Sequence, residues 1–410
     1  MSTIRLQWSL WKNEEVRLPD SKSWWNRYYL IKALSGQSLS EPKIYQADDV
    51  HRMYDGLTQT GAEINVGGAG TAYRFMTANL ALRARRSGRT FRLDGNDQMR
   101  KRPIRALVDA LRLLGTRIEY VGNKGYPPLL IQPGNLKGGT LHWSNRESSQ
   151  FVSALMMIAP YLDEGLQIRW SGRLVSGSYI DLTQEIMEAC GATIQREKHK
   201  IVIEPGEYSE DFHIRPQGDW SSAAFWLSAL MLRGRGSVTL RDLYPGTHQG
   251  DECLLGIYKS WGLQATPTQV GMHVALLDRN LPERLDIDLG DAPDLVPTMA
   301  ATAVGLRMVG RIKGIGHLRF KESNRLESLK AELERWGATV EIGEDQLKWG
   351  SFAKPQEDIV HRTYGDHRMA MAFAPLAQIK EIKIEDPEVV AKSYPLFWEE
   401  GEKLGLASSS

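Results

Sequence analysis

A chain of 410 residues is too long for one compact hydrophobic core and predicts at least two domains. Hydrophobic residues make up 42% and charged residues 25%, as in ordinary globular proteins. Its 51 basic and 50 acidic residues leave a net charge of +1, which excludes a global field that would attract nucleic acid or a membrane surface. An anionic ligand would therefore have to be bound by a local cluster of Lys and Arg.

The cysteines and the apolar stretches restrict the compartment. Cys190 and Cys253 are too few for a disulfide framework and indicate a reducing environment. Residues 1–12 lack an apolar stretch of signal-peptide length, and apolar stretches such as 154–162 are too short to cross a bilayer. The sequence predicts a soluble, cytoplasmic protein that binds neither nucleic acid nor membrane. We also expect that it uses no metal or cofactor and that it is a monomer, although no sequence feature determines the oligomeric state.

A repeated pattern runs along the chain: an amphipathic helix, a glycine, and two or three residues that lead into a strand. Glycine directly after a helix favours the left-handed conformation that ends it, and alternating residues beyond it are typical of a strand. Six copies at similar spacing predict six structural units. Their glycines are Gly61, Gly115, Gly191, Gly262, Gly337 and Gly405.

A second type of segment lies between these copies and predicts buried helices. Each segment opens with small, polar or charged residues and continues as a nearly all-apolar run. Several such helix starts facing one cleft would bind anions, because the first turn presents free N–H groups. The segments are 71–82, 148–160, 219–232, 294–306 and 366–377.

The six units divide into two groups of three. Turn signals at Pro19 and at Pro216 predict two crossings between the groups. The expected domains are 21–216, and 1–20 together with 217–410. Two crossings predict a hinge around a cleft.

Three motifs in the first expected domain place polar groups at helix starts. Residues 21–27 put Lys22 at a helix mouth and Arg27 about one turn in, although a capped surface helix explains them equally well. The glycines of 67–70 permit close backbone approach to a phosphate, but a simple turn would also use them. Residues 148–150 offer more hydrogen-bonding side chains than N-capping needs, which favours ligand binding modestly.

The second expected domain carries the densest charge. Lys321 and Arg325 are four residues apart and share a helix face, for which a solvated surface is the usual explanation. Residues 366–368 are a charge trio directly before a buried helix. Asp294 lies between two prolines at another helix mouth, where it could equally serve as the cap.

Taken together, nine motifs resemble the family of 3-phosphoshikimate 1-carboxyvinyltransferases, or EPSP synthases, in the family's order over nearly the whole chain. They are 21–27, 69–74, 99–104, 148–151, 218–225, 249–251, 319–326, 364–373 and 391–395. The resemblance implies an α/β (α+β) fold: a two-lobed, inside-out α/β barrel in which each lobe has three βαβαββ repeats, with a hinge and a cleft between the lobes.

The resemblance also implies a reaction. An enzyme of this family transfers the enolpyruvyl group of phosphoenolpyruvate to the 5-hydroxyl of shikimate 3-phosphate and releases phosphate, on the route to chorismate and the aromatic amino acids. Asp294 would take the proton of the hydroxyl, and Glu322 with Lys22 would protonate C3. These three residues are the implied catalytic set.

Two binding sets come with the resemblance, and their cations would neutralise two phosphates and two carboxylates. The lobe 21–216 is expected to hold shikimate 3-phosphate, and the other lobe to supply the acid–base groups and hold phosphoenolpyruvate. Shikimate 3-phosphate is expected at Lys22, Ser23, Arg27, Ser148, Ser149, Gln150, Ser176, Asp294, His317 and Lys321. Phosphoenolpyruvate is expected at Lys22, Gly70, Gln98, Gln150, Arg325, Arg368 and Lys392.

The chain departs from the family's usual residues at several positions. Gln98 replaces an Arg that normally helps to hold phosphoenolpyruvate, and Arg100 is the candidate to compensate for it. The other departures are Trp24 and Trp25 for small residues, Gly68 for Asn, His317 for Asn, and Asn324 for Asp.

Two other functions stay open. The sister activity transfers enolpyruvyl to UDP-N-acetylglucosamine and typically has a cysteine on the loop that corresponds to 95–99, where this chain has none. A degraded homologue would bind an anion or a partner without turnover, and the departures at Gly68 and Gln98 favour that alternative.

Overall fold

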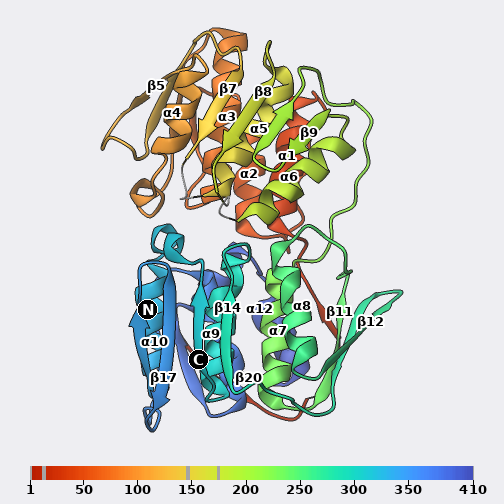
Figure 1. Ribbon diagram of the computed structural model, residues 1–410, viewed down its shortest axis with the longest axis vertical. Helices are drawn as coiled ribbons and strands as arrows, with labels where there is room; N and C mark the ends of the chain where they lie inside the picture. Colours follow the sequence, from red (N-terminus) through yellow and green to blue (C-terminus); the bar gives the residue numbers. More distant parts are fainter. Residues whose placement is uncertain (1, 12–14, 145–147, 173–175, 410) are drawn as a thin grey trace. The chain divides into compact units, whose positions relative to one another are not determined.

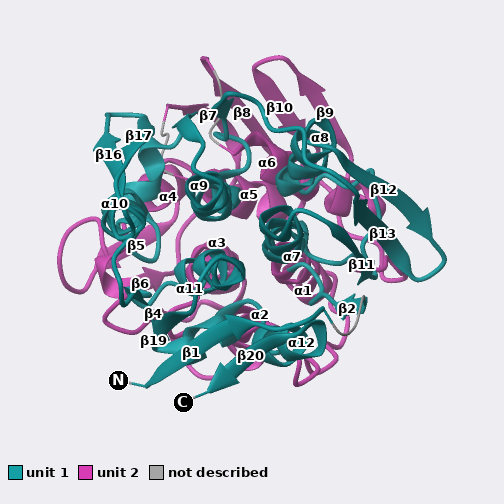
Figure 2. Cartoon of the chain, turned by 90° about the horizontal axis from the view of Figure 1, so that it is seen from below, with its two compact units in different colours: residues 1–21, 217–410 teal, residues 22–216 magenta. Residues whose placement is uncertain are grey.

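The computed structural model describes residues 2–11, 15–144, 148–172 and 176–409. The chain divides into two compact units: unit 1 is Met1–Ser21 with Gln217–Ser410, and unit 2 is Lys22–Pro216. Figures 1 and 2 show that both units mix helices and sheets. The boundary expected after residue 20 lies one residue later, after Ser21, and the second boundary follows Pro216.

Unit 1 contains three βαβαββ repeats, each closed into a four-stranded sheet. The first is β2 (Glu15–Arg17), α7 (Trp220–Arg233), β11 (Gly236–Arg241), α8 (Cys253–Ser260), β12 (Leu263–Thr268) and β13 (Gly271–Leu276). The second is β14 (Arg284–Asp288), α9 (Val296–Gly305), β15 (Val309–Lys313), α10 (Arg325–Glu334), β16 (Ala338–Ile342) and β17 (Gln346–Phe352). The third is β18 (Val360–His361), α11 (His367–Phe373), β19 (Ile382–Glu385), α12 (Phe397–Leu404), β20 (Leu406–Ser409) and β1 (Thr3–Trp8).

The three sheets share one strand order and one pattern of strand directions. In the order β14-β15-β17-β16, the first pair is parallel and the other two pairs are antiparallel. The N-terminal strand β1 completes the third sheet between β19 and β20. Strand β2 is the parallel edge strand of the first sheet. The two N-terminal strands therefore belong to unit 1, although the chain next enters unit 2.

Unit 2 contains two complete repeats of the same pattern. One is β3 (Glu63–Asn65), α3 (Gly70–Ser87), β4 (Phe91–Asp94), α4 (Arg105–Leu113), β5 (Arg117–Tyr120) and β6 (Leu129–Gln132). The other is β7 (Gly139–Trp143), α5 (Ser149–Ile158), β8 (Leu166–Trp170), α6 (Gly177–Ala189), β9 (Ile194–Glu197) and β10 (Lys200–Ile203).

The expected third repeat of unit 2 is reduced to two helices, α1 (Lys22–Leu34) and α2 (Asp48–Thr58). Residues 22–62 are all described and include no strand. The connection 35–47 has three Ser, one Gly and one Pro and no alternating apolar residues that could form a strand. Gly61 also differs from the other five repeat glycines, which all have positive φ, because α2 already ends two residues earlier in extended backbone at Gln59.

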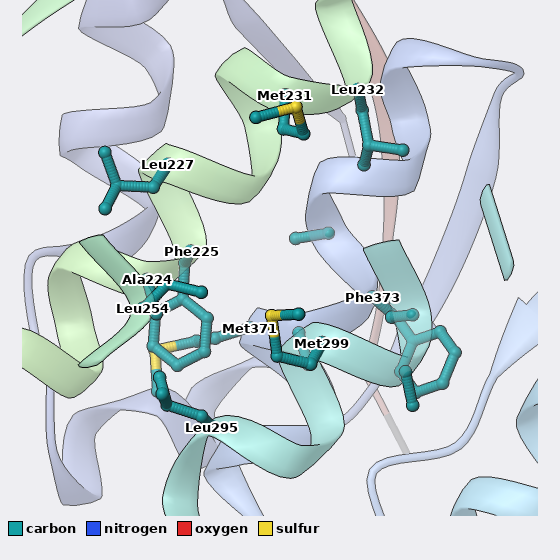
Figure 3. Close-up of a cluster of buried hydrophobic side chains, with 14 of the residues drawn as sticks. Ala224, Phe225, Leu227, Met231, Leu232, Leu254, Leu295, Met299, Met371 and Phe373 are labelled. Atoms are coloured by element: carbon teal, nitrogen blue, oxygen red, sulfur yellow. The ribbon is translucent and has the colours of Figure 1, made fainter. Parts of the chain in front are cut away.

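The predicted apolar helices lie inside the sheets of each unit. In unit 1, α7, α9 and α11 pack together, and Figure 2 shows them end-on within the teal sheets. Their buried contacts include Phe225 and Met231 of α7, Met299 of α9 and Met371 of α11 (Figure 3). In unit 2, α1, α3 and α5 contact one another in the same way. Because these helices are covered on all sides, an all-apolar sequence is stable there.

Polar groups at the starts of the inner helices act as caps. Asp219 accepts the backbone N–H of Ser222 at 3.0 Å, and Asp366 accepts that of Arg368 at 3.0 Å. Ser148 accepts the backbone N–H of Gln150 at 3.3 Å. Among the described residues, no helix combines the length and the hydrophobicity needed to cross a bilayer.

The helix-ending glycines make a prediction about stability. Gly115 has φ +105°, and an added Cβ would collide with the carbonyl oxygen of Asn135. We expect Gly115→Ala to destabilise unit 2 by about 2 kcal/mol or more, through backbone strain and the clash. Gly61→Ala is the matched control, because Gly61 has an ordinary φ and its nearest neighbour atom is 3.8 Å away. Urea unfolding of both variants tests this, and equal midpoints would contradict it.

Candidate active site

Arg325, the first residue of α10, binds three carboxylates. Its Nη1 lies 3.0 Å from Asp294 Oδ1, its Nη2 lies 2.9 Å from Glu322 Oε2, and its Nε lies 2.8 Å from Asp366 Oδ2. The guanidinium is 1% exposed. Burial alone would lower the pKa of Arg325, but the three carboxylates together raise it above its usual value. This one side chain brings the two expected catalytic acids into a single cluster.

Two more expected cations border the same acids. Arg368 Nη2 lies 2.8 Å from Asp294 Oδ2, and Lys392 Nζ lies 3.6 Å from Glu322 Oε1. Asp294 is thus held between two arginines, and Glu322 between an arginine and a lysine. The structure brings together five of the residues predicted from the sequence.

His317 lies beside this cluster on the 3₁₀ helix η5 (Gly316–Phe320) and is 8% exposed. Burial, and then the positive charge of Lys321, lower the pKa of His317 to about 3 against the opposing effect of Asp294. The ring is therefore neutral at pH 7. Within the part of the chain that the structure describes, its Nε2 has no hydrogen-bond partner. A neutral imidazole at this place can exchange a hydrogen bond with a ligand hydroxyl, as an Asn would.

Asp251 is a buried acid of unit 1 on the 3₁₀ helix η3 (Gly250–Glu252). It belongs to the 249–251 motif, but it was not among the expected site residues. Ser221 Oγ, which also accepts from Arg368 at 3.4 Å, donates to Asp251 Oδ2. Burial, followed by the charge of Asp294, raises the pKa of Asp251 to about 7. The signal that could have found it is an acid in the 249–251 motif, directly before the predicted amphipathic helix that became α8.

In unit 2, Lys22 and Ser23 open helix α1. Lys22 Nζ lies 2.7 Å from Asp49 Oδ2 on α2, and the two side chains are 15% and 6% exposed. Asp49 belongs to none of the motifs, so no sequence signal marked it. Helices α1 and α2, which replace a sheet repeat here, fix the expected catalytic lysine through this ion pair.

Arg27 is fully buried and links three helices. Its Nε donates to Thr183 Oγ1 at 2.7 Å, and its Nη2 donates to Ser153 Oγ at 3.2 Å and to the carbonyl of Tyr179 at 3.1 Å. Burial lowers the pKa of Arg27 to about 10. In this structure Arg27 holds α1 against α5 and α6, and its expected contact with shikimate 3-phosphate stays a prediction.

The remaining polar residues of the first binding set lie at the starts of α5 and α6. Gln150 donates to Thr71 Oγ1 at 2.9 Å and accepts from Arg74 Nη1 at 2.6 Å, so it joins α5 to α3. Ser149 is buried beside it, and Ser176, at the start of α6, is buried in a left-handed conformation with φ 54°. The structure thus gathers these residues at helix starts within one unit.

Gly70 begins α3 and has an arginine directly against it. A Cβ built on Gly70 would collide with the guanidinium of Arg102, with Nη2 at 2.9 Å. Arg102 follows the 3₁₀ helix η1 (Met99–Lys101) and is 6% exposed, whereas Gln98 precedes η1. Arg102 belongs to the 99–104 motif but to neither of the expected binding sets. Only glycine permits this close approach.

The structure argues against Arg100 as the replacement for the missing arginine. Its Nε and Nη2 donate to the two oxygens of Asp94 at 3.0 and 2.8 Å, and its Nη1 reaches Asp97 at 3.4 Å. Arg100 thus turns toward its own strand and loop. At Gly68, where the family usually has Asn, the same loop occupies part of the space of the absent side chain. The amide of Asn96 lies 3.0 Å from where a Cβ of residue 68 would be.

A family model described as EPSP synthase (3-phosphoshikimate 1-carboxyvinyltransferase) matches residues 58–400. The chain belongs to this family. Proteins named 3-phosphoshikimate 1-carboxyvinyltransferase are 37% identical in Bacteroides fragilis, over 95% of both chains, and 32% identical in Mannheimia haemolytica, over 96% of both. The solved EPSP synthase of Acinetobacter baumannii, at 21% identity, covers 100% of both chains with a TM-score of 0.74 and shows the same fold.

Membership agrees with the resemblance stated from the motifs and with the mixed α/β architecture. Among the described residues, no group of three or more His, Cys, Asp or Glu is arranged to hold a metal ion. The individual residue roles in this member of the EPSP synthase family rest on the geometry above and stay predictions.

The raised pKa of Asp251 predicts a pH dependence of stability. The folded unit holds a proton that the unfolded chain loses above about pH 4, so this stability is complete below about pH 4 and is lost as the pH rises through about 7. Asp251→Asn stays neutral, and we expect its free energy of unfolding to fall less between pH 5 and pH 8 than that of the wild type, by about 1–3 kcal/mol. Urea unfolding at both pH values measures this, and parallel losses would show that folded Asp251 is already ionised at pH 5.

Proposed function

We propose that this chain transfers the enolpyruvyl group of phosphoenolpyruvate to the 5-hydroxyl of shikimate 3-phosphate and releases phosphate. The observation that carries the proposal is the cluster in which Arg325, Arg368 and Lys392 surround Asp294 and Glu322. Three cations beside two acids suit a reaction that needs acid–base chemistry on anionic substrates. The names of the relatives support the same reaction.

In the proposed first step, the 5-hydroxyl oxygen attacks C2 of phosphoenolpyruvate and its proton passes to Asp294. Glu322, assisted by Lys22, protonates C3, and a tetrahedral intermediate results. In the second step C3 returns a proton to Glu322 and the double bond forms again. The C2–O bond to phosphate breaks, and Asp294 gives its proton to the departing phosphate. Because each acid takes part in both steps in opposite directions, neither is consumed.

The proposed binding roles follow the expected sets. Lys22, Gly70, Gln98, Gln150, Arg325, Arg368 and Lys392 would contact phosphoenolpyruvate. Lys22, Ser23, Arg27, Ser148, Ser149, Gln150, Ser176, Asp294, His317 and Lys321 would contact shikimate 3-phosphate. Arg102 joins the first set as a cation beside Gly70. The positive dipole ends of the helices that begin at these residues add to the cations in a chain whose net charge is only +1.

A phosphate-release assay with both substrates tests the proposal and separates it from the two alternatives. Release with UDP-N-acetylglucosamine instead of shikimate 3-phosphate would indicate the sister activity. Binding of both substrates without release would indicate a degraded homologue.

The role of Asp294 predicts a specific loss. We expect Asp294→Asn to lower kcat by roughly a hundredfold or more, because the amide cannot accept the hydroxyl proton. Asp286→Asn is the control, since Asp286 is a carboxylate of the same unit that pairs with Arg311 and Lys313 on strand β15. Steady-state phosphate release measures both variants. Normal turnover of Asp294→Asn would show that Asp294 serves as an ion-pair partner of Arg325 and not as the proton acceptor.

Gln98 predicts a gain of affinity. Arg100 is bound to Asp94, so we expect Gln98→Arg to add a charge-assisted contact and to lower the KM for phosphoenolpyruvate about tenfold. The KM for shikimate 3-phosphate should hardly change. Gln195→Arg, at an exposed position of strand β9, controls for added charge. An unchanged or raised KM for phosphoenolpyruvate would mean that another cation, such as Arg102, already fills this place.

A further inference from the structure

Glu332 is a fully buried carboxylate that has no place in the proposed chemistry. It lies on α10 seven residues, or about two turns, after Arg325, so both side chains are on one face of the helix. The carboxylate is 0% exposed. A buried carboxylate is stable only when hydrogen-bond donors or cations surround it, and its surroundings therefore show what it does.

Three groups face this carboxylate. Tyr364 Oη donates to Oε1 at 2.8 Å, His361 Nδ1 lies 2.8 Å from Oε2, and Arg335 Nε lies 3.0 Å from Oε2 as an ion pair. Arg335 belongs to the end of the same helix, whereas His361 and Tyr364 belong to the segment that leads into α11. Glu332 therefore holds residues 361–364 against α10 by hydrogen bonds.

The protonation state of His361 follows from a fourth group. Trp336 Nε1 donates to His361 Nε2 at 3.1 Å, and an indole N–H can only donate. Nε2 must then be the acceptor, so Nδ1 carries the proton and donates to Glu332. Burial lowers the pKa of His361, which agrees with a neutral ring. The network has one consistent direction of hydrogen bonding: indole to imidazole to carboxylate, with the phenol donating to the other oxygen.

The segment that Glu332 holds against α10, residues 361–366, ends at the candidate site. Tyr364 has φ 56° and Gly365 has φ 67°, so the chain makes a left-handed turn directly before Asp366. A non-glycine residue adopts this conformation only when its surroundings hold it. Asp366 is then bound by Arg325 at the start of α10, and Arg368 reaches Asp294. Helix α10 thus holds residues 361–366 at two places, by Glu332 and by Arg325.

We propose that Glu332 is a positioning residue for Arg368. Glu332 acts by accepting the hydroxyl hydrogen bond of Tyr364, which holds the left-handed turn at residues 364 and 365. Without this contact the turn can relax, and the start of α11 can shift relative to Asp294. Arg368 would then meet phosphoenolpyruvate in a less favourable geometry. This inference rests on the proposed function, in which Arg368 binds that substrate.

The test uses the full-length chain and Tyr364→Phe, which removes one hydroxyl and leaves His361 and Arg335 on Glu332. We expect the KM for phosphoenolpyruvate to rise about three- to tenfold, while the KM for shikimate 3-phosphate stays within about twofold. The matched control is Tyr244→Phe. Tyr244 is 36% exposed against 38% for Tyr364, and its hydroxyl donates at 3.3 Å to the backbone carbonyl of Gln269, away from the cluster.

A double variant separates positioning from mere structure. If Tyr364 acts only through Glu332, then Glu332→Gln with Tyr364→Phe raises the KM for phosphoenolpyruvate no more than Glu332→Gln alone. Three results would overturn the inference: an unchanged KM in Tyr364→Phe, an equal rise of both KM values, or a double variant whose effects simply add.

The same experiment distinguishes a failure of the inference from a failure of the proposed function. A wild type that releases no phosphate with the two substrates defeats the proposed function. In that case calorimetry with phosphoenolpyruvate alone decides the inference: weaker binding by Tyr364→Phe than by wild type and Tyr244→Phe supports it, and equal or undetectable binding by all three overturns it.

Discussion

The charge of Arg325 is the constraint on which the rest of unit 1 depends. A guanidinium that is 1% exposed is stable only if carboxylates replace the water that it has lost, and three of them do so. They come from the start of α9, from the loop before α10 and from the cap of α11. Removing one partner of such a buried pair typically costs about 3–5 kcal/mol. The second and third repeats must therefore pack in one relative arrangement, and Arg325 also holds the two candidate catalytic acids of the second repeat near each other.

Those parts of the fold that depend on local sequence could be predicted. A glycine that ends a helix needs only its own left-handed conformation, and an inner helix needs only an apolar surface on all sides. The pattern was wrong about the third repeat of unit 2. Gly61 stands three residues beyond the end of α2 and has an ordinary φ, and the connection before α2 lacks a strand pattern. A sequence match around a glycine does not show that the preceding helix extends as far as that glycine.

The candidate site could be predicted only in part, for a similar reason. The 319–326 motif located Glu322 and Arg325, and the two prolines at a helix start located Asp294. Neither gave any sign of Asp49 beside Lys22 or of Glu332 next to Tyr364. Those pairs join residues that are 27 and 32 positions apart, and tertiary packing alone brings them together. Arg102 shows the same limit on a smaller scale, because the sequence named only Arg100 as the candidate to compensate for Gln98. Arg100 lies within η1 and binds Asp94, whereas Arg102, directly after η1, lies against Gly70.

The pairing of cations with acids in unit 1 has a consequence for the proposed reaction. Arg325, Arg368 and Lys392 each contact a carboxylate of the protein, so an anionic substrate has to share these cations with Asp294 and Glu322. A carboxylate that shares its cation with a phosphate is less stabilised in its charged form and accepts a proton more readily. Substrate binding would therefore prepare the acids for proton transfer at the moment when the transfer is needed. Asp366 keeps Arg325 in place during this exchange, since it is fully buried and caps α11 as well. On this account the third carboxylate is needed because the other two have to be free to react.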